Sequence, residues 1–199
     1  MFDLILPVAL FAFSMSITPG PNNVMVTASG ANFGYRRTIP HLLGIGLGYP
    51  AMVAGVGFGL GGVFEAVPAV HVVLQYVGAA AILWMAWRIA TASGPGPAQG
   101  RPGRPFTFLQ AAAFQWVNPK GWVVAISAIS AFTTVEGDLL FEVGAITLSF
   151  VSVNYACASV WTLFGVGIGR LLKRGGWLRT FNVAMGLLLV AAIVPLFID

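Results

Sequence analysis

Residues Ser16–Asn23 read SITPGPNN and lie in the middle of a long uncharged stretch, Leu4–Tyr35. Two prolines and a glycine stand together in this segment. Proline lacks the backbone N–H donor and clashes with the preceding helical turn. The segment therefore predicts an interruption, more than a bend, in a helix made from Leu4–Tyr35.

A second segment repeats this pattern in the other half of the chain. Residues Gln115–Trp122 read QWVNPKGW and lie inside the stretch Pro105–Val135. Thr18-Pro19 corresponds to Asn118-Pro119 at a spacing of 100 residues. Interrupted helices in matching positions of two halves indicate a transport site. The alternative is two ordinary packing kinks, which single prolines commonly cause in membrane helices.

The composition indicates an integral membrane protein. Of the 199 residues, 58% are hydrophobic and 8% are charged, against roughly a quarter charged in an average soluble domain. These values exclude a soluble globule and intrinsic disorder, and the few scattered basic residues argue against nucleic acid as a partner. A spanning helix needs about 20 apolar residues. Six stretches meet that length, the fourth interrupted by one lysine: Leu4–Tyr35, Thr38–Phe64, Ala66–Trp87, Pro105–Val135, Val143–Gly169 and Thr180–Ile198.

The charged residues separate according to the connection in which they lie. Nine of the ten basic residues fall between stretches one and two, three and four, or five and six. All six acidic residues fall in the remaining connections or near the termini. Basic connections stay in the cytoplasm. We therefore expect a multi-pass protein with both termini on the outer side.

Residues 93–105 form the one long segment rich in proline and glycine, and they predict a flexible cytoplasmic linker. The linker separates a first three-helix unit, residues 1–92, from a second, residues 106–199. The expected topology gives the two units opposite orientations, as in transporters built from inverted repeats. The predicted fold is an all-α membrane protein with six transmembrane helices in two inverted three-helix repeats. Its helices 1 and 4 are broken by proline near the bilayer midplane.

The half-helices that follow the two interruptions are expected to bind the substrate. Each begins with free backbone N–H groups at the positive end of a helix dipole, which favours an anion. The two ends approach from opposite sides and would meet around one substrate, for which an amino-acid carboxylate fits. The predicted substrate-binding residues are Thr18, Pro19, Gly20, Pro21, Asn22, Asn23, Gln115, Asn118, Pro119 and Lys120.

Lys120 is the only Lys, Arg, Asp or Glu expected deep in the membrane. A lysine at that depth costs about 2.5–3.5 kcal/mol on insertion scales, so it requires a partner or neutralisation. Three explanations stay open. Lys120 pairs with the substrate carboxylate, or it loses its proton when the site is empty and couples transport to protons, or it extends along a water-filled cavity.

Two further polar residues are candidates for gating or proton transfer. His41 lies near the expected cytoplasmic start of the second helix, where an interfacial position is favoured and a gating or proton role is the alternative. Asn154 lies in the fifth stretch, where such residues more commonly bond neighbouring helices than ligands.

The sequence contains no recognisable enzyme site. It has no P-loop, no HExxH motif and no acid–histidine pair expected at one depth. We therefore expect a protein that is not an enzyme and that binds no cofactor or metal. A metal-ion exporter is one alternative, but it needs ligands at the midplane. A transmembrane electron carrier of similar inverted-repeat architecture is another, but it needs two thiols, and Cys157 is the only cysteine.

Several segments resemble the lysine exporter (LysE/RhtB) family of bacterial amino-acid exporters. These are SITPGPNNV from Ser16, GANFGYRR from Gly30, HLLGIGLG from His41 and FQWVNPKGW from Phe114. The resemblance covers essentially the whole chain. Within the family, the segment LQYVGAAAILWMAWRIA from Leu74 looks most similar to the cysteine/O-acetylserine exporter branch.

The resemblance implies an exporter of amino acids or close derivatives in the bacterial plasma (inner) membrane, usually thought to be driven by protons. Its partners are then a small amino-acid substrate and the lipid bilayer, and a homo-oligomer stays open. Many members carry an acidic residue where this chain has Tyr49. Tyr49 thus joins the residues considered for gating or proton transfer. Without an acid at the midplane, a small neutral amino acid is favoured over a basic one.

Overall fold

The computed structural model describes residues 2–66, 68–92, 104–172, 177–194 and 197, and all its regular elements are helical. Most of the predicted linker, residues 93–103, lies outside the described residues. The helices are α1 (Phe2–Ile17), α2 (Pro21–Phe33), α3 (Tyr35–Gly55), the π-helix η1 (Val56–Leu60), α4 (Gly61–Ala66), α5 (Pro68–Ala90), α6 (Phe108–Gln115), α7 (Pro119–Phe132), α8 (Leu139–Leu171) and α9 (Trp177–Ala191).

By length and composition, the described residues contain three or four candidate membrane-spanning helices, fewer than the six that the sequence predicts. Tyr35–Leu60, Val72–Ala90 and Leu139–Leu171 are long and apolar enough to span a bilayer. The pair Leu4–Ile17 and Pro21–Phe33, bent by 60° at its break, adds a fourth span if it is counted as one. α7 and α9 are apolar but shorter. Six spans in two inverted repeats therefore stay a prediction.

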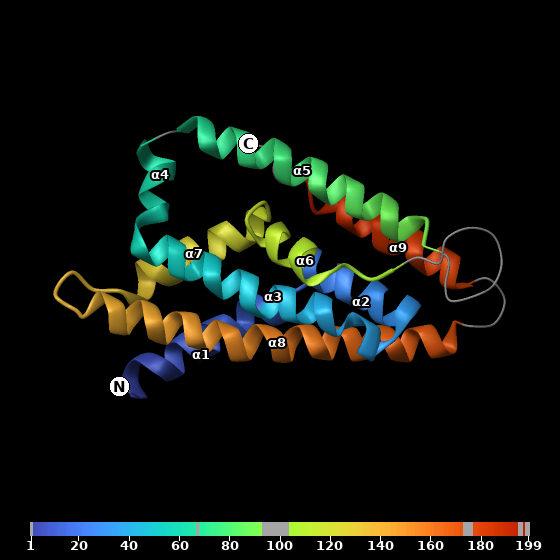
Figure 1. The fold of residues 1–199 in the computed structure, drawn as a ribbon, viewed down its shortest axis with the longest axis horizontal. Coiled ribbons are helices and arrows are strands. Elements are labelled where there is room, and N and C mark those ends of the chain that lie inside the picture. Colours follow the sequence, from blue (N-terminus) through green and yellow to red (C-terminus); the bar gives the residue numbers. More distant parts are fainter. Residues whose placement is uncertain (1, 67, 93–103, 173–176, 195–196, 198–199) are drawn as a thin grey trace.

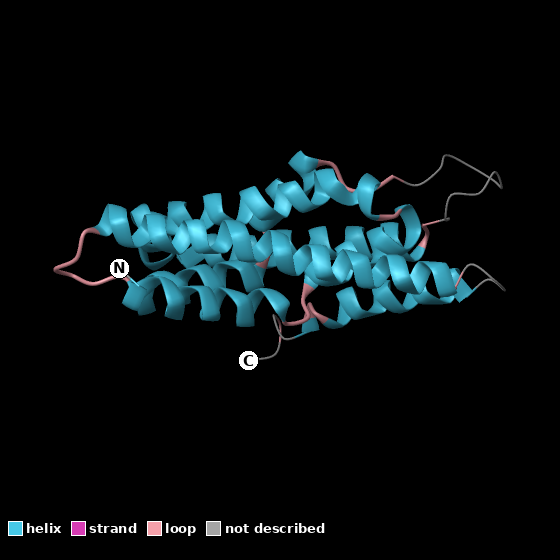
Figure 2. Cartoon of the chain, turned by 90° about the horizontal axis from the view of Figure 1, so that it is seen from below, coloured by secondary structure: helices cyan, strands magenta, loops and turns pink. Residues whose placement is uncertain are grey.

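The helices form an elongated bundle around α8, the longest of them (Figure 1). α8 runs the length of the bundle and packs against α1, α2 and α3. α5 pairs with α9, and α3 pairs with α6. Non-helical segments occur in the middle of the bundle as well as at its ends (Figure 2). Many large apolar side chains lie exposed on the bundle, such as Leu6, Leu109 and Leu140, as expected of a surface that faces lipid.

The connections gather at the two ends of the bundle according to charge. The α2–α3 junction and the ends of α5 and α8 lie at one end (Figure 1), which we call the basic end. The start of α1, α4 and the α7–α8 connection lie at the other end. The basic end carries Arg36, Arg37, Arg88, Arg104, Arg170 and Arg179, and the opposite end carries Asp3, Glu65, Glu136, Asp138 and Glu142. The separation of charge read from the sequence is thus present along the bundle axis.

Glycine controls two features of the bundle. Gly59 has φ +113°, a left-handed conformation that favours glycine, and it marks the kink at which α4 turns away from α3. Gly30 of α2 and Gly165 and Gly169 of α8 lie against the backbone of the facing helix, with no room for a side chain. Small residues of this kind let membrane helices approach closely. The contact of α2 with α8 therefore depends on them.

Gly165→Ala tests the close contact of α2 with α8. The added Cβ would overlap the carbonyl oxygen of Thr27, whereas nothing lies within 4 Å of the same position at Gly167. We expect Gly165→Ala to lower the melting temperature of the detergent-solubilised protein by about 3–10 °C. The matched control Gly167→Ala should keep or slightly raise it, because alanine favours a helix. Equal melting temperatures for the two variants would show that the close approach contributes nothing.

Candidate functional site

The structure brings the two interruptions together in the middle of the bundle. α1 ends at Ile17 and α2 begins at Pro21, while α6 ends at Gln115 and α7 begins at Pro119. The segments between these helices come from opposite halves of the chain. Their side chains bond directly to one another, as the following contacts show.

Lys120 makes the first link between the two interruptions. Its Nζ donates to the carbonyl oxygen of Thr18 at 3.1 Å, to Thr18 Oγ1 at 2.8 Å and to the carbonyl oxygen of Pro19 at 3.2 Å. A cation is stabilising at the negative end of a helix dipole, and Thr18 directly follows α1. The half-buried ammonium thus joins the start of α7 to the end of α1.

An amide pair makes the second link. Asn22 Nδ2 donates to Gln115 Oε1 at 2.8 Å, and Gln115 Nε2 donates back to Asn22 Oδ1 at 3.2 Å. Gln115 Nε2 also donates to the carbonyl oxygen of Ala111 at 2.8 Å. The Gln115 side chain is completely buried. This reciprocal pair fixes the start of α2 against the end of α6.

Side chains also satisfy the other carbonyl groups released at the end of α1. Asn23 Nδ2 donates to the carbonyl oxygens of Ser16 at 2.9 Å and Thr18 at 2.8 Å. Trp161 Nε1 of α8 donates to the carbonyl oxygen of Ile17 at 3.1 Å. Buried backbone groups of a membrane protein must be paired within the protein or face a water-filled cavity. The broken helix is therefore stabilised by its neighbours.

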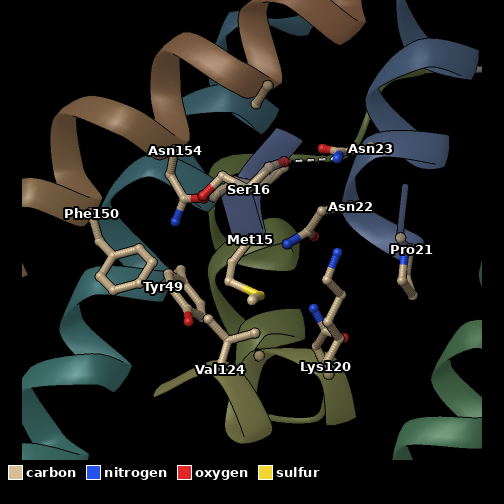
Figure 3. A pocket seen from close by; sticks show the side chains of 15 residues that line it. Met15, Ser16, Pro21, Asn22, Asn23, Tyr49, Lys120, Val124, Phe150 and Asn154 are labelled. Atoms are coloured by element: carbon tan, nitrogen blue, oxygen red, sulfur yellow. Dashed lines mark hydrogen bonds between the residues drawn. The ribbon is translucent and has the colours of Figure 1, made fainter. Parts of the chain in front are cut away.

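A cavity of about 50 Å³ lies beside the two interruptions, room for about four water molecules at roughly 10–15 Å³ each. Figure 3 shows its lining side chains converging from α1, α2, α3, α7 and α8. The lining residues are Met15, Ser16, Gly20, Pro21, Asn22, Asn23, Ile45, Tyr49, Asn118, Lys120, Gly121, Val124, Phe150, Asn154 and Ala158. We call this the central cavity. It lies at the N-terminal ends of both α2 and α7.

Polar atoms in the central cavity include two without partners in the described part of the chain. The Tyr49 hydroxyl and Asn118 Oδ1 are buried and make no hydrogen bond there. Ser16 Oγ donates to Asn154 Oδ1 at 2.8 Å. Buried polar groups are nearly always paired. Tyr49 and Asn118 are therefore well placed to bond a small polar ligand or ordered water.

The charge and shape of the central cavity restrict what it can hold. Lys120 is the only charged residue in its lining, and no carboxylate contributes. Its apolar wall includes Tyr49 and Phe150, whose rings meet edge to face with centroids 5.2 Å apart. A Cβ at Gly20 would approach Lys120 Cδ at 3.0 Å, so this glycine leaves space for the lysine side chain. The cavity suits a small group that carries a negative charge.

The predicted substrate-binding residues divide into two groups. Gly20, Pro21, Asn22, Asn23, Asn118 and Lys120 line the central cavity. Thr18, Pro19, Gln115 and Pro119 do not line it, and they form or hold the two interruptions.

The three residues considered for gating or proton transfer also divide. Tyr49 and Asn154 line the central cavity, and His41 does not. The His41 side chain is completely buried within the protein, and its ring lies 5.3 Å from the Phe106 ring between centroids. Its interfacial position in the membrane stays a prediction. Both of its ring nitrogens lack a hydrogen-bond partner in the described chain.

Sequence reasoning named Asn154 of α8 but missed the other residues that α8 and α1 contribute to the site. Trp161 and Phe150 lie about 30–45 residues beyond the second interruption, and no local pattern connects them with it. Met15 and Ser16 directly precede the first break, so their position was the only available signal.

Among the described residues, no group of three or more His, Cys, Asp or Glu side chains is arranged to hold a metal ion.

Comparison with known proteins connects this geometry to a family. Residues 13–198 match the family described as LysE type translocator. The chain is 32% identical to a cysteine/O-acetylserine efflux protein of Shigella flexneri serotype 5b, over 96% of this chain and 98% of that protein. It is likewise 32% identical to the protein of that name in Escherichia coli K12, over 92% of this chain and 91% of the relative. No solved structure matches the chain.

Asn23→Ala tests the role of side chains at the end of α1. The substitution removes both hydrogen bonds from Asn23 and leaves the Ser16 carbonyl without the partner described above. An unsatisfied buried group costs about 1–3 kcal/mol, so we expect the melting temperature in detergent to fall by about 3–10 °C. Ser14→Ala is the control, because it removes only a bond to Leu10 within the helix. An equal, small change in both variants would contradict this role.

Proposed function

This chain belongs to the LysE family of translocators, and on that basis we propose that it exports a small neutral amino acid or a close derivative by alternating access. The observation that carries the proposal is the meeting of two interrupted helices from opposite halves around the central cavity, with Lys120 as its one charged lining residue. The proposed location is the bacterial plasma membrane.

The proposed substrate class follows from the chemistry of the central cavity. The relatives of this chain are named for efflux of cysteine and O-acetylserine. Both are small amino acids without a charged side chain. The lining offers no carboxylate to balance the side chain of a basic amino acid. A small side chain also fits the limited space between Tyr49 and Phe150. We therefore favour neutral substrates of this size.

The substrate carboxylate binds beside Lys120 in this proposal. The oxygens that Lys120 contacts belong to uncharged groups of Thr18 and Pro19, so its charge has no anionic partner in the described cavity lining. The starts of α2 and α7 border the same cavity and add backbone N–H groups and positive dipole ends. The Tyr49 hydroxyl and Asn118 Oδ1 are available to accept hydrogen bonds from the substrate ammonium group. Asn154 Oδ1 already accepts from Ser16 Oγ and can accept a second hydrogen bond.

Two inverted three-helix repeats, residues 1–92 and 106–199, are the proposed basis of alternating access. In support, α1 and α2 lead from the acidic end of the bundle to the basic end, and α6 and α7 lead back (Figure 1). Counting each interrupted pair as one span, and α9 as a short span, gives six. With the basic end in the cytoplasm, both termini lie outside.

We propose that protons supply the energy for uphill export. The sequence carries no nucleotide-binding motif, so uphill export would use an ion gradient or a partner protein, of which we favour the gradient. Lys120 is the candidate proton carrier in the central cavity, where gain or loss of its proton would alternate with binding of the substrate carboxylate. His41, buried with two unpaired ring nitrogens, is a second candidate outside the cavity.

Counterflow in proteoliposomes tests the function and the role of Lys120 together. Vesicles containing the purified protein and loaded with unlabelled cysteine, O-acetylserine, homoserine, threonine or lysine are supplied with the corresponding labelled compound outside. We expect exchange of one or more small neutral amino acids and little exchange of lysine. Exchange of no amino acid would overturn the proposal.

In the same assay, Lys120→Ala should reduce exchange to background, a loss of about 100-fold, while membrane insertion stays intact. Loss of a charged hydrogen-bonding group costs about 1.5–3 kcal/mol. Lys120→Gln separates charge from packing, because an amide can still donate to the carbonyl groups at the break. Arg36→Ala, at an exposed position outside the cavity lining, is the control for general loss of charge. Normal exchange by Lys120→Ala would remove Lys120 from the site.

Asn154→Asp should shift the substrate preference toward basic amino acids. It places a carboxylate in a cavity that has none, and the aspartate can still accept the hydrogen bond from Ser16. We expect neutral amino acids to exchange about tenfold more slowly, because the new carboxylate repels the substrate carboxylate. Lysine should become a substrate, because the new carboxylate attracts its side-chain ammonium group. Asn154→Ser is the uncharged control. An unchanged preference would place the substrate side chain and ammonium away from Asn154.

A further inference from the structure

A second cavity, of about 220 Å³, lies at the basic end of the bundle between α2, the end of α5 and residues 104–106. Its polar lining consists of Ser29, Asn32, Arg88, Thr91 and Arg104. None of these residues belongs to the central cavity. We call this second space the arginine pocket.

Aromatic rings and a backbone bond hold Arg88 in place. Its guanidinium carbon lies 4.6 Å from the ring centroid of Phe106 and 5.0 Å from that of Trp84. Its Nη2 donates to the carbonyl oxygen of Arg104 at 3.1 Å. A guanidinium has five N–H donors, so most of the donors of Arg88 stay available beside those of the exposed Arg104.

Among the residues that the structure describes, the positive charge of the arginine pocket has no acidic partner at its end of the bundle. Of the acidic residues that the structure describes, all belong to the start of α1, to α4 or to the α7–α8 connection and start of α8, at the opposite end. Residues 93–103, which follow α5 in the chain, contain no Asp or Glu. Two guanidinium groups in one pocket repel each other unless an anion lies between them.

The side chains around the arginine pocket indicate where its anion comes from. Trp84 and Trp87 are 49% and 69% exposed, and tryptophan favours the membrane–water interface. Basic pockets between helices at that depth bind lipid headgroups, and the planar guanidinium fork matches phosphate oxygens. We propose that the arginine pocket binds the phosphate group of an anionic phospholipid. A zwitterionic amino acid carries no net charge and gains less from such a site.

A bound headgroup would join three separate parts of the chain. The lining residues come from α2, from the last turns of α5 and from the segment that leads into α6. Asn182 of α9 already bonds Asn32 of α2 and the carbonyl oxygen of Ala92 beside the pocket. The phosphate would thus stabilise the region where the two halves of the chain meet at the basic end.

Lipid binding by the purified full-length protein in a neutral detergent tests the proposal. The probes are short-chain phosphatidylglycerol, short-chain phosphatidylcholine and inorganic phosphate, with binding followed by native mass spectrometry and by the melting temperature. We expect phosphatidylglycerol to bind about tenfold more tightly than phosphatidylcholine. Arg104→Gln should weaken phosphatidylglycerol binding about tenfold. The side chain of Arg104 is exposed, so the variant should keep the melting temperature of the unsubstituted protein.

Arg36→Gln is the matched control, because Arg36 is exposed at the same end but does not line the arginine pocket. It should change the affinity less than twofold. Equal binding of the two lipids, or equal losses in the two variants, would overturn the proposal in favour of general surface charge. Displacement of the lipid by an equal concentration of inorganic phosphate would identify free phosphate, and not a lipid, as the occupant. Arg88→Gln should repeat the result of Arg104→Gln wherever its melting temperature confirms a folded protein.

Discussion

The ammonium group of Lys120 against the carbonyl oxygens of Thr18 and Pro19 is the contact on which the centre of the molecule depends. A helix broken inside a membrane releases backbone groups that neither lipid nor its own turns can satisfy. Here the groups released in the first half of the chain are satisfied by Lys120 from the second half and by Trp161 of α8. The first break therefore depends on side chains from the second half of the chain, and the central cavity lies where these contacts join the two breaks.

The local part of this arrangement could be predicted from the sequence, and the long-range part could not. Proline and glycine act on their own turn, so SITPGPNN and VNPKG indicate where helices end and begin, and charge indicates which connections share an end of the bundle. The acceptors of Lys120 could not be predicted, because backbone carbonyl groups carry no sequence signal. The partner that the sequence offered was the carboxylate group of the substrate. The burial of His41 could not be predicted either, because its position in the stretch shows its approximate depth but not which neighbours surround it. The role of Trp161 depends on how α8 packs against α1, which no pattern near either motif encodes.

One feature, positive charge without an acidic partner among the described residues, recurs at both cavities. Lys120 in the centre and Arg88 with Arg104 at the basic end present cations where the described chain supplies no acid. In both places glycine or aromatic rings shape the space around the cation, with Gly20 beside Lys120 and Phe106 beside Arg88. Ligand anions are then the natural completion of the charge balance. In the two proposals, the chain thus separates recognition of the carboxylate group of a transported amino acid from recognition of the phosphate group of a membrane lipid.

The reciprocal bonds between Asn22 and Gln115 have a consequence for the energetics of opening. Any movement that separates the start of α2 from the end of α6 must break both hydrogen bonds. The pair therefore adds a fixed release energy, the free energy of breaking these two bonds, to the cost of opening. Because two carboxamides carry no net charge and do not titrate, that release energy is the same at every pH and nearly the same at every salt concentration. The contribution of this pair to opening is therefore independent of acidity, whereas the contacts of Lys120 with Thr18 and Pro19 depend on its proton.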